Sequence, residues 1–169
     1  MVAVPVVIAL AVVLNLSTPP VDGPASVDGP TAGPRAELPP LDVQTPEITE
    51  VADALCPGVM GGLPLLLDDA QARPVRSASA YAAAWGDPPI VLRCGVPRPA
   101  GYVVGASSLL INGVDWYAEP GADQTVWTTV DREVYVEVSV PSARASAPIA
   151  TLSAVIADRL PAQTPRPGE

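Results

Sequence analysis

Few side chains of this 169-residue chain could do acid–base or nucleophilic chemistry. The sequence contains no histidine and no lysine, so a serine or cysteine nucleophile would have no ordinary base beside it. The groups left for proton transfer are carboxylates, chiefly Asp115, Asp131, Glu133 and Glu137. Glu133 and Glu137 share the parity of one predicted strand, on the face where solvated charges are normal. The sequence therefore assigns no catalytic residue. A small enzyme that uses Asp115 and Glu137 is the alternative to a binding protein.

Patterns that hold metals, phosphates or nucleic acids are also missing. Two cysteines without histidine are too few for a zinc site, and no acidic loop of the calcium-binding type occurs. The glycines lack the strand and lysine of a phosphate-binding loop. A formal net charge of −9 without a basic stripe disfavours nucleic-acid binding. We therefore predict no metal, no cofactor and no nucleic-acid partner.

Arg93 is the residue that most favours a ligand site. It lies in an apolar run, where Asp87 or Asp131 could neutralise it. One interpretation is a structural ion pair. The other is an anchor for an anion or carboxylate in a pocket lined by Trp85 and Trp116.

Tryptophans are the other candidates for contact with a partner. One interpretation is that the tryptophans pack in the core or on the hairpins. If they are exposed together on one face, they would instead stack on sugars or contact a partner protein. Trp127 belongs to this group. The candidate ligand or partner contacts are Trp85, Arg93, Asp115 and Trp116.

The only two cysteines, Cys56 and Cys94, should form a disulfide if the domain is translocated. Closing a loop of about 39 residues would contribute roughly 4 kcal/mol to stability in the chain-entropy model. Two alternatives stay open: buried free thiols, or a redox pair, although a redox pair normally has C-x-x-C spacing.

The N-terminus predicts export. Residues 2–16 carry no charge and one polar side chain, Asn15, and the first charged residue is Asp22. This run is long for a signal segment and short for a full span, which needs about 20 residues. No basic residue precedes it and no clear small-residue cleavage site follows it. We expect a signal or a marginal anchor at residues 1–16 that places the rest outside the membrane or secretes it; a buried core helix is the alternative.

Residues 17–46 predict a disordered tether. They contain eight prolines and three glycines, and Val21-Asp22-Gly23-Pro24 recurs at residues 27–30. Proline removes backbone donors and fixes φ, so neither helix nor sheet can propagate. The composition is typical of an extended spacer, with a ligand for a proline-recognising partner as the less favoured interpretation.

A helix should follow the tether. Thr45 resembles an N-cap with Pro46 at the first helical position. Pro57 should end or kink this helix after Cys56, and a short second helical piece could reach Leu67. The apolar stripe at helical spacing consists of Ile48, Val51, Ala52, Leu55 and Val59.

Strands fill the middle of the domain. Asn112-Gly113 predicts a tight hairpin between residues 109–111 and 114–117. A second hairpin turns at Asp131-Arg132, and its return strand alternates valine with polar residues. The alanines in the first segment would equally suit a helix. The predicted strands are residues 79–85, 90–94, 109–111, 114–117, 124–130 and 133–140.

A last helix begins at Ser146 and stops at Pro161, before a tail at residues 161–169 that we expect to be disordered. Its stripe is Ile149, Leu152, Ile156 and Leu160. Residues 47–160 thus predict an α+β two-layer sandwich, with a mostly antiparallel sheet of about five strands and helices near both ends.

Four sequence runs resemble an actinobacterial family of exported proteins, domain-of-unknown-function family 3515. They are residues 85–96, 112–116, 128–132 and 135–138, and the resemblance covers roughly residues 55–160. It implies an envelope location and one disulfide-bearing domain behind a membrane segment. It implies no activity and no catalytic residues.

These features together predict an exported or membrane-anchored envelope protein whose domain is a non-enzymatic binding or accessory module. The expected partner is an envelope protein or a cell-wall component, with membrane contact through residues 1–16.

Overall fold

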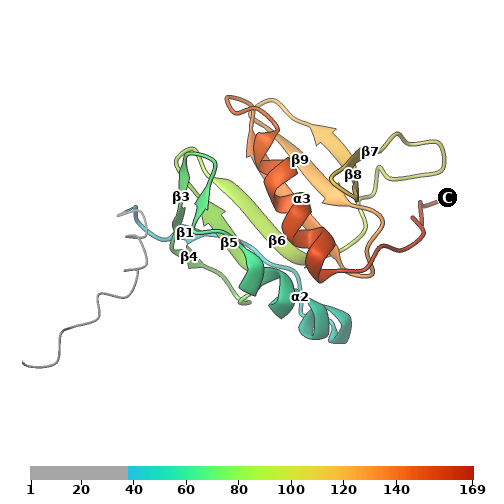
Figure 1. Cartoon of the computed structure of the whole chain (residues 1–169), viewed down its shortest axis with the longest axis horizontal. Coiled ribbons are helices and arrows are strands. Elements are labelled where there is room, and N and C mark those ends of the chain that lie inside the picture. Colours follow the sequence, from blue (N-terminus) through green and yellow to red (C-terminus); the bar gives the residue numbers. More distant parts are fainter. Residues whose placement is uncertain (1–37) are drawn as a thin grey trace, which may run out of the picture. The chain divides into compact units, whose positions relative to one another are not determined.

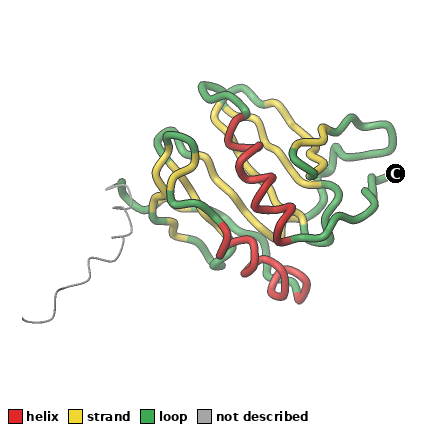
Figure 2. Tube along the Cα trace, viewed as in Figure 1, coloured by secondary structure: helices red, strands yellow, loops and turns green. Residues whose placement is uncertain are grey.

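The computed structural model describes residues 38–169, which form one antiparallel sheet with two helices (Figure 1). The predicted export segment and tether residues 17–37 lie outside the described residues. Both helices, α2 (Glu50–Gly62) and α3 (Ala147–Arg159), lie over the sheet (Figure 2). The order of strands across the sheet is β2 (Leu66–Leu67), β3 (Ala70–Arg73), β5 (Ala82–Trp85), β6 (Ile90–Val96), β10 (Tyr135–Pro141), β9 (Gln124–Thr129), β8 (Val114–Pro120) and β7 (Leu109–Ile111).

The predicted α+β class is confirmed, but the sheet has eight strands rather than about five. The missed strands β2 and β3 contain two and four residues, too few to show an alternating pattern. Leu66 and Leu67 lie in β2 instead of the second helical piece expected there. A separate parallel pair, β1 (Leu41–Asp42) with β4 (Val75–Arg76), was also missed.

One face of the sheet forms the core with the helices. Along β6 the residues alternate strictly, and Ile90, Leu92, Cys94 and Val96 are buried. The predicted valine face of β10 is confirmed: Val136, Val138 and Val140 are buried, and so is Val134 just before the strand. Alternation with a period of two places these residues on one side of the pleat.

The Asn-Gly hairpin is confirmed. Asn112 and Gly113 have φ values of 47° and 80°, the pair of positive angles that a type I′ turn requires. The second hairpin differs from expectation because its connection spans residues 130–134 instead of two residues. Asp131 and Arg132 are buried there as an ion pair with a nitrogen–oxygen distance of 2.7 Å. The loop between β9 and β10 is therefore packed into the domain and is not an exposed hairpin turn.

The start of α2 was predicted four residues too early. Its N-cap is Thr49, whose Oγ1 accepts a hydrogen bond from the Ala52 amide at 3.1 Å. Pro57, which was expected to end or kink the helix, does not end it, because the helix continues to Gly62. Pro57 and Asp53 are both exposed, so the carbonyl that loses its helical donor lies on the solvent side.

The buried side of α2 is narrower than its apolar stripe. Ala52, Cys56 and Val59 are buried, as the stripe predicts for Ala52 and Val59. Ile48 and Val51 were expected in the core, but they are 52% and 40% exposed. Within the helix, Val51 faces solvent, whereas Ile48 precedes the N-cap and lies outside the helix.

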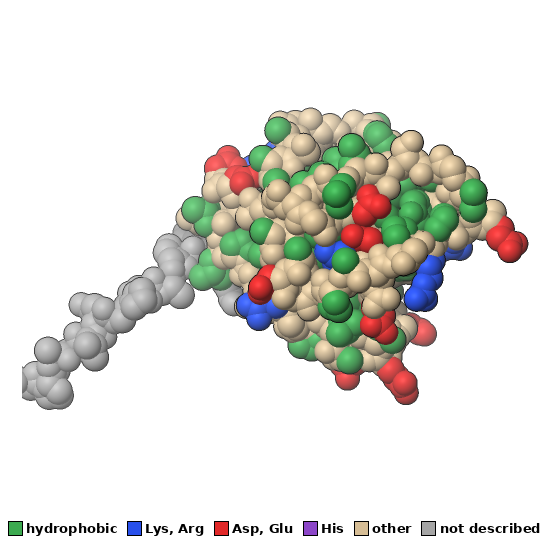
Figure 3. Space-filling model, turned by 45° about the vertical axis from the view of Figure 1, so that its right-hand side comes forward, with side chains coloured by type: hydrophobic (Ala, Val, Ile, Leu, Met, Phe, Trp, Pro, Cys, Tyr) green, Lys and Arg blue, Asp and Glu red, His purple; other side chains and the backbone are tan. Residues whose placement is uncertain are grey.

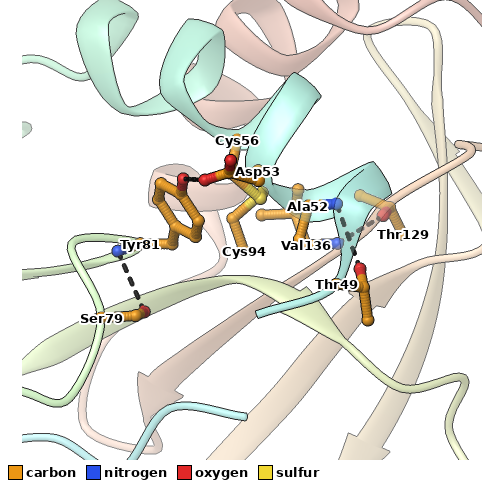
Figure 4. Close-up of a disulfide and its surroundings, with 9 residues drawn as sticks. All are labelled: Thr49, Ala52, Asp53, Cys56, Ser79, Tyr81, Cys94, Thr129 and Val136. Carbon is orange, nitrogen blue, oxygen red and sulfur yellow. Dashed lines mark hydrogen bonds between the residues drawn. A yellow bond between two sulfur atoms is a disulfide. The ribbon is translucent and has the colours of Figure 1, made fainter. Parts of the chain in front are cut away.

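The predicted disulfide is confirmed. Cys56 of α2 bonds to Cys94 of β6 with a Cα–Cα distance of 5.8 Å, and both residues are buried (Figure 4). Gly95 follows with φ +89°, at a β-bulge opposite Tyr135 and Val136. A Cβ at Gly95 would lie 2.9 Å from the Ala52 Cβ, so glycine permits the close approach of α2.

The predicted stripe of α3 is confirmed, since Ile149, Leu152, Ile156 and Leu160 are all buried. Ser146 occupies the N-cap position without a side-chain hydrogen bond. Beyond α3, the tail that was expected to be disordered runs along the domain. The Gln163 amide donates to the Asp131 carbonyl at 2.7 Å, and Gly168 bridges to Val103.

Replacing both cysteines by alanine should lower the free energy of unfolding by about 4 kcal/mol, because the cross-link closes a loop of 38 residues. Urea unfolding of the C56A/C94A variant followed by tryptophan fluorescence would measure this. The wild type in a thiol reductant should approach the same midpoint. A loss below about 1 kcal/mol would contradict the entropic role of the bond.

Candidate functional site

The candidate site lies on the sheet face opposite the helices, called the open face here. Arg93 and Glu137 are register partners on β6 and β10, at positions that alternate with the buried core residues. Arg93 Nε and Nη2 donate to Glu137 Oε1 at 3.0 and 2.5 Å. The Arg93 side chain is 31% exposed and that of Glu137 is 15% exposed. Neither Asp87 nor Asp131, the partners suggested by sequence, forms this pair.

Residues 38–46 cross the open face and are held by three arginines; we call this segment the strap. Arg73 Nη2 donates to the Pro39 carbonyl at 2.7 Å, and Arg93 Nη1 donates to the Gln44 carbonyl at 3.0 Å. Arg76 pairs with Asp42 at 2.8 Å beside the β1–β4 ladder. The strap is the C-terminal part of the segment that was predicted to be a disordered tether.

A cavity of about 480 Å³ lies between the strap and the open face. Arg93, Glu137, Arg98 and Glu119 all line it, so its charges balance. The Arg93 guanidinium is already bonded to Glu137 and the strap. Arg98 forms no ion pair with a residue in the range 38–169, which makes it the cation available to a carboxylate or other anion. Arg98 was not among the predicted site residues, although its place between two prolines indicates an exposed loop.

The tryptophans lie on the other face of the sheet. Trp85 and Trp116 are 1% and 0% exposed. The Trp85 indole donates to the Pro64 carbonyl at 2.8 Å, and that of Trp116 donates to Ser153 Oγ at 2.9 Å. A pocket that joins Arg93 to these two side chains therefore does not form, because the sheet separates them. Trp127, half-buried, packs against the same core.

Asp115 lies at the other end of the open face. Its side chain is half-buried and near Tyr102, which is buried and packs on Tyr117 with ring centroids 5.5 Å apart. Burial raises the pKa of Tyr102 above its ordinary value near 10, and the carboxylate of Asp115, together with Tyr135 and Asp131, raises it further.

The carboxylates offered by the sequence do not gather in one place. Glu137 pairs with Thr128 on β9, and Thr128 pairs with Tyr117 on β8. Asp115 therefore lies two strands away from Glu137 and two residues further along its strand. Standard strand spacings place the Cα atoms of these two residues about 12 Å apart. Asp131 is engaged by Arg132, and Glu133 is exposed. Residues 38–169 contain no group of three or more His, Cys, Asp or Glu that could hold a metal ion.

A larger cavity, about 690 Å³, opens where β4 diverges from β5. Alanines, two serines and larger apolar residues such as Met60, Leu65 and Trp85 line it, together with Arg73 and Arg76. Both arginines already hold the strap, so this cavity presents little free side-chain chemistry.

The Arg93–Glu137 pair should show a coupling energy of about 1–2 kcal/mol in a double-mutant cycle, because both partners are mostly buried and doubly hydrogen-bonded. Urea unfolding of R93A, E137A and the double variant would measure it. The matched control is Arg76–Asp42, whose side chains are 67% and 75% exposed and should couple much more weakly. Equal couplings would contradict a structural role for the buried pair.

Tyr102 should make stability depend on alkaline pH. The fold favours its neutral form, so its contribution is fully present below the unfolded-state pKa near 10 and is lost as pH rises through the raised folded-state pKa. Unfolding free energies measured from pH 8 to 11 should therefore fall more steeply for the wild type than for Y102F. Parallel pH profiles for the two proteins would refute this effect.

Comparison with known proteins identifies a family, but no activity is assigned to that family. The family model described as "Protein of unknown function (DUF3515)" matches residues 1–165. No curated protein and no solved structure matches the chain. Because the match covers nearly the whole chain, this protein belongs to the DUF3515 family of proteins of unknown function.

Proposed function

We propose that this chain is an exported or membrane-anchored envelope protein whose domain binds another envelope component, either a protein or cell-wall material. The observation that carries the proposal is the buried Cys56–Cys94 disulfide, which uses both cysteines of the chain. Structural disulfides persist in oxidising compartments and are rare where thiols are kept reduced.

Sequence features support the same location. Residues 2–16 are uncharged and apolar, and the proline-rich run follows directly. Such a segment is typical of an export signal or anchor. No helix within residues 38–169 is both long and apolar enough to cross a membrane.

A binding role has more support than catalysis. Two of the four carboxylates with a possible acid–base role are held in ion pairs, Glu137 by Arg93 and Asp131 by Arg132. Asp115, the partner of Glu137 in the alternative enzyme, lies two strands away from it. A paired-carboxylate mechanism would need the two groups to face one substrate.

Export predicts that a thiol placed on the domain surface is accessible from outside the cell. Ala143 lies in the exposed turn before α3. In intact cells, A143C should react with a membrane-impermeant maleimide, whereas Cys56 and Cys94 should stay unlabelled. Intact mass after non-reducing alkylation would show one added label.

The matched control is A143C without residues 2–16, which should be labelled only after the cells are permeabilised. The export proposal would be contradicted if full-length A143C were labelled only after permeabilisation and if Cys56 and Cys94 were then reactive as well. That result would place the domain in a reducing compartment.

A further inference from the structure

An apolar groove lies at the first turn of α2, separate from the Arg93 cavity but adjoining it. Its volume is about 610 Å³. We call it the α2 groove. Its apolar lining comes from Pro46, Val51, Val96, Pro97, Val134 and Tyr135.

Val51 of α2 lines this groove, is 40% exposed and does not belong to the domain core. Ile48, which is 52% exposed, precedes the N-cap Thr49 and is not part of the groove lining. Gly95 at the bulge forms another part of the lining.

Carboxylates supply the only charges of the groove lining. Glu47 and Glu133 stand on the two sides, one before α2 and one before β10, and both are exposed. Neither forms an ion pair with a residue in the range 38–169. Arg98 lines the adjoining cavity but not the groove.

We propose that the α2 groove binds an extended apolar segment of a partner protein that carries an arginine or lysine. Val51 and its apolar neighbours would take the uncharged side chains, and Glu47 and Glu133 would pair with the cation. This inference rests on the proposed binding function and names the chemistry of its partner.

A second copy of this chain fits the groove poorly. Each chain carries a formal net charge of −9, and acidic side chains lie among apolar ones on the face that Figure 3 displays. Two α2 grooves brought together would set unpaired carboxylates against each other, which is unfavourable.

The test uses the full chain in an uncharged detergent and two dye-labelled ten-residue peptides of alternating valine and serine. One peptide has a central arginine and the other a central glutamate. Fluorescence anisotropy should show saturable binding of the arginine peptide alone. E47K/E133K should weaken that binding about tenfold and admit the glutamate peptide. V51D should weaken binding of the arginine peptide by placing a charge on the apolar wall.

D123K/D158K is the matched control, because it changes the net charge equally at two exposed positions outside the groove lining. It should leave both peptides unaffected. The inference is overturned if the arginine peptide does not bind, if both peptides bind equally, or if the two charge variants behave alike. It is also overturned if sedimentation shows a dimer that V51D converts to a monomer. None of these results alters the A143C labelling, so failure here is distinguishable from failure of the export proposal.

Discussion

The disulfide between Cys56 and Cys94 joins α2 to β6 at the point where Gly95 interrupts the strand. The bulge and the absent side chain at Gly95 let Ala52 come close, so this part of the helix lies near the strand. This joint fixes how α2 is rotated about its axis. The rotation buries Val59, leaves Val51 in solvent and opens the α2 groove beside the bulge. The α2 groove is thus a consequence of how the disulfide and Gly95 position α2 on the sheet.

The two faces of the sheet use polar interactions in different ways. On the helix side, the indole groups of Trp85 and Trp116 each find one acceptor and are otherwise enclosed in apolar packing. On the open face, arginines hold backbone carbonyls of the strap, so a segment with little regular structure still has a defined path. Arg93 serves this role and binds Glu137 at the same time, which leaves it little capacity for an external ligand. Arg98, at the rim of the same cavity, keeps that capacity.

Membership of the DUF3515 family brings no activity with it, so function has to be argued from surfaces. Within the Arg93 cavity, Arg93 and Glu137 pair with each other, which suits a structural role. The α2 groove differs, because its apolar wall and its two carboxylates lack partners in the described chain. This arrangement supports the proposal that the domain holds a segment of another protein.

Local patterns in the sequence were enough to predict the α+β class, the Asn112-Gly113 hairpin, the alternation along β10 and the stripe of α3. Each depends on periodicity or turn chemistry that neighbouring residues impose on one another. The cysteine pairing also followed, since only one pair exists. Tertiary structure decided the rest. Pro57 stays within α2 because its lost hydrogen bond lies on the solvent side, and β2 and β3 form because neighbouring strands supply the partners that such short segments need. Arg93 selects Glu137 because register brings residues 44 positions apart to opposite sites. Which residues share a face across different strands depends on register, and no spacing along the chain encodes it.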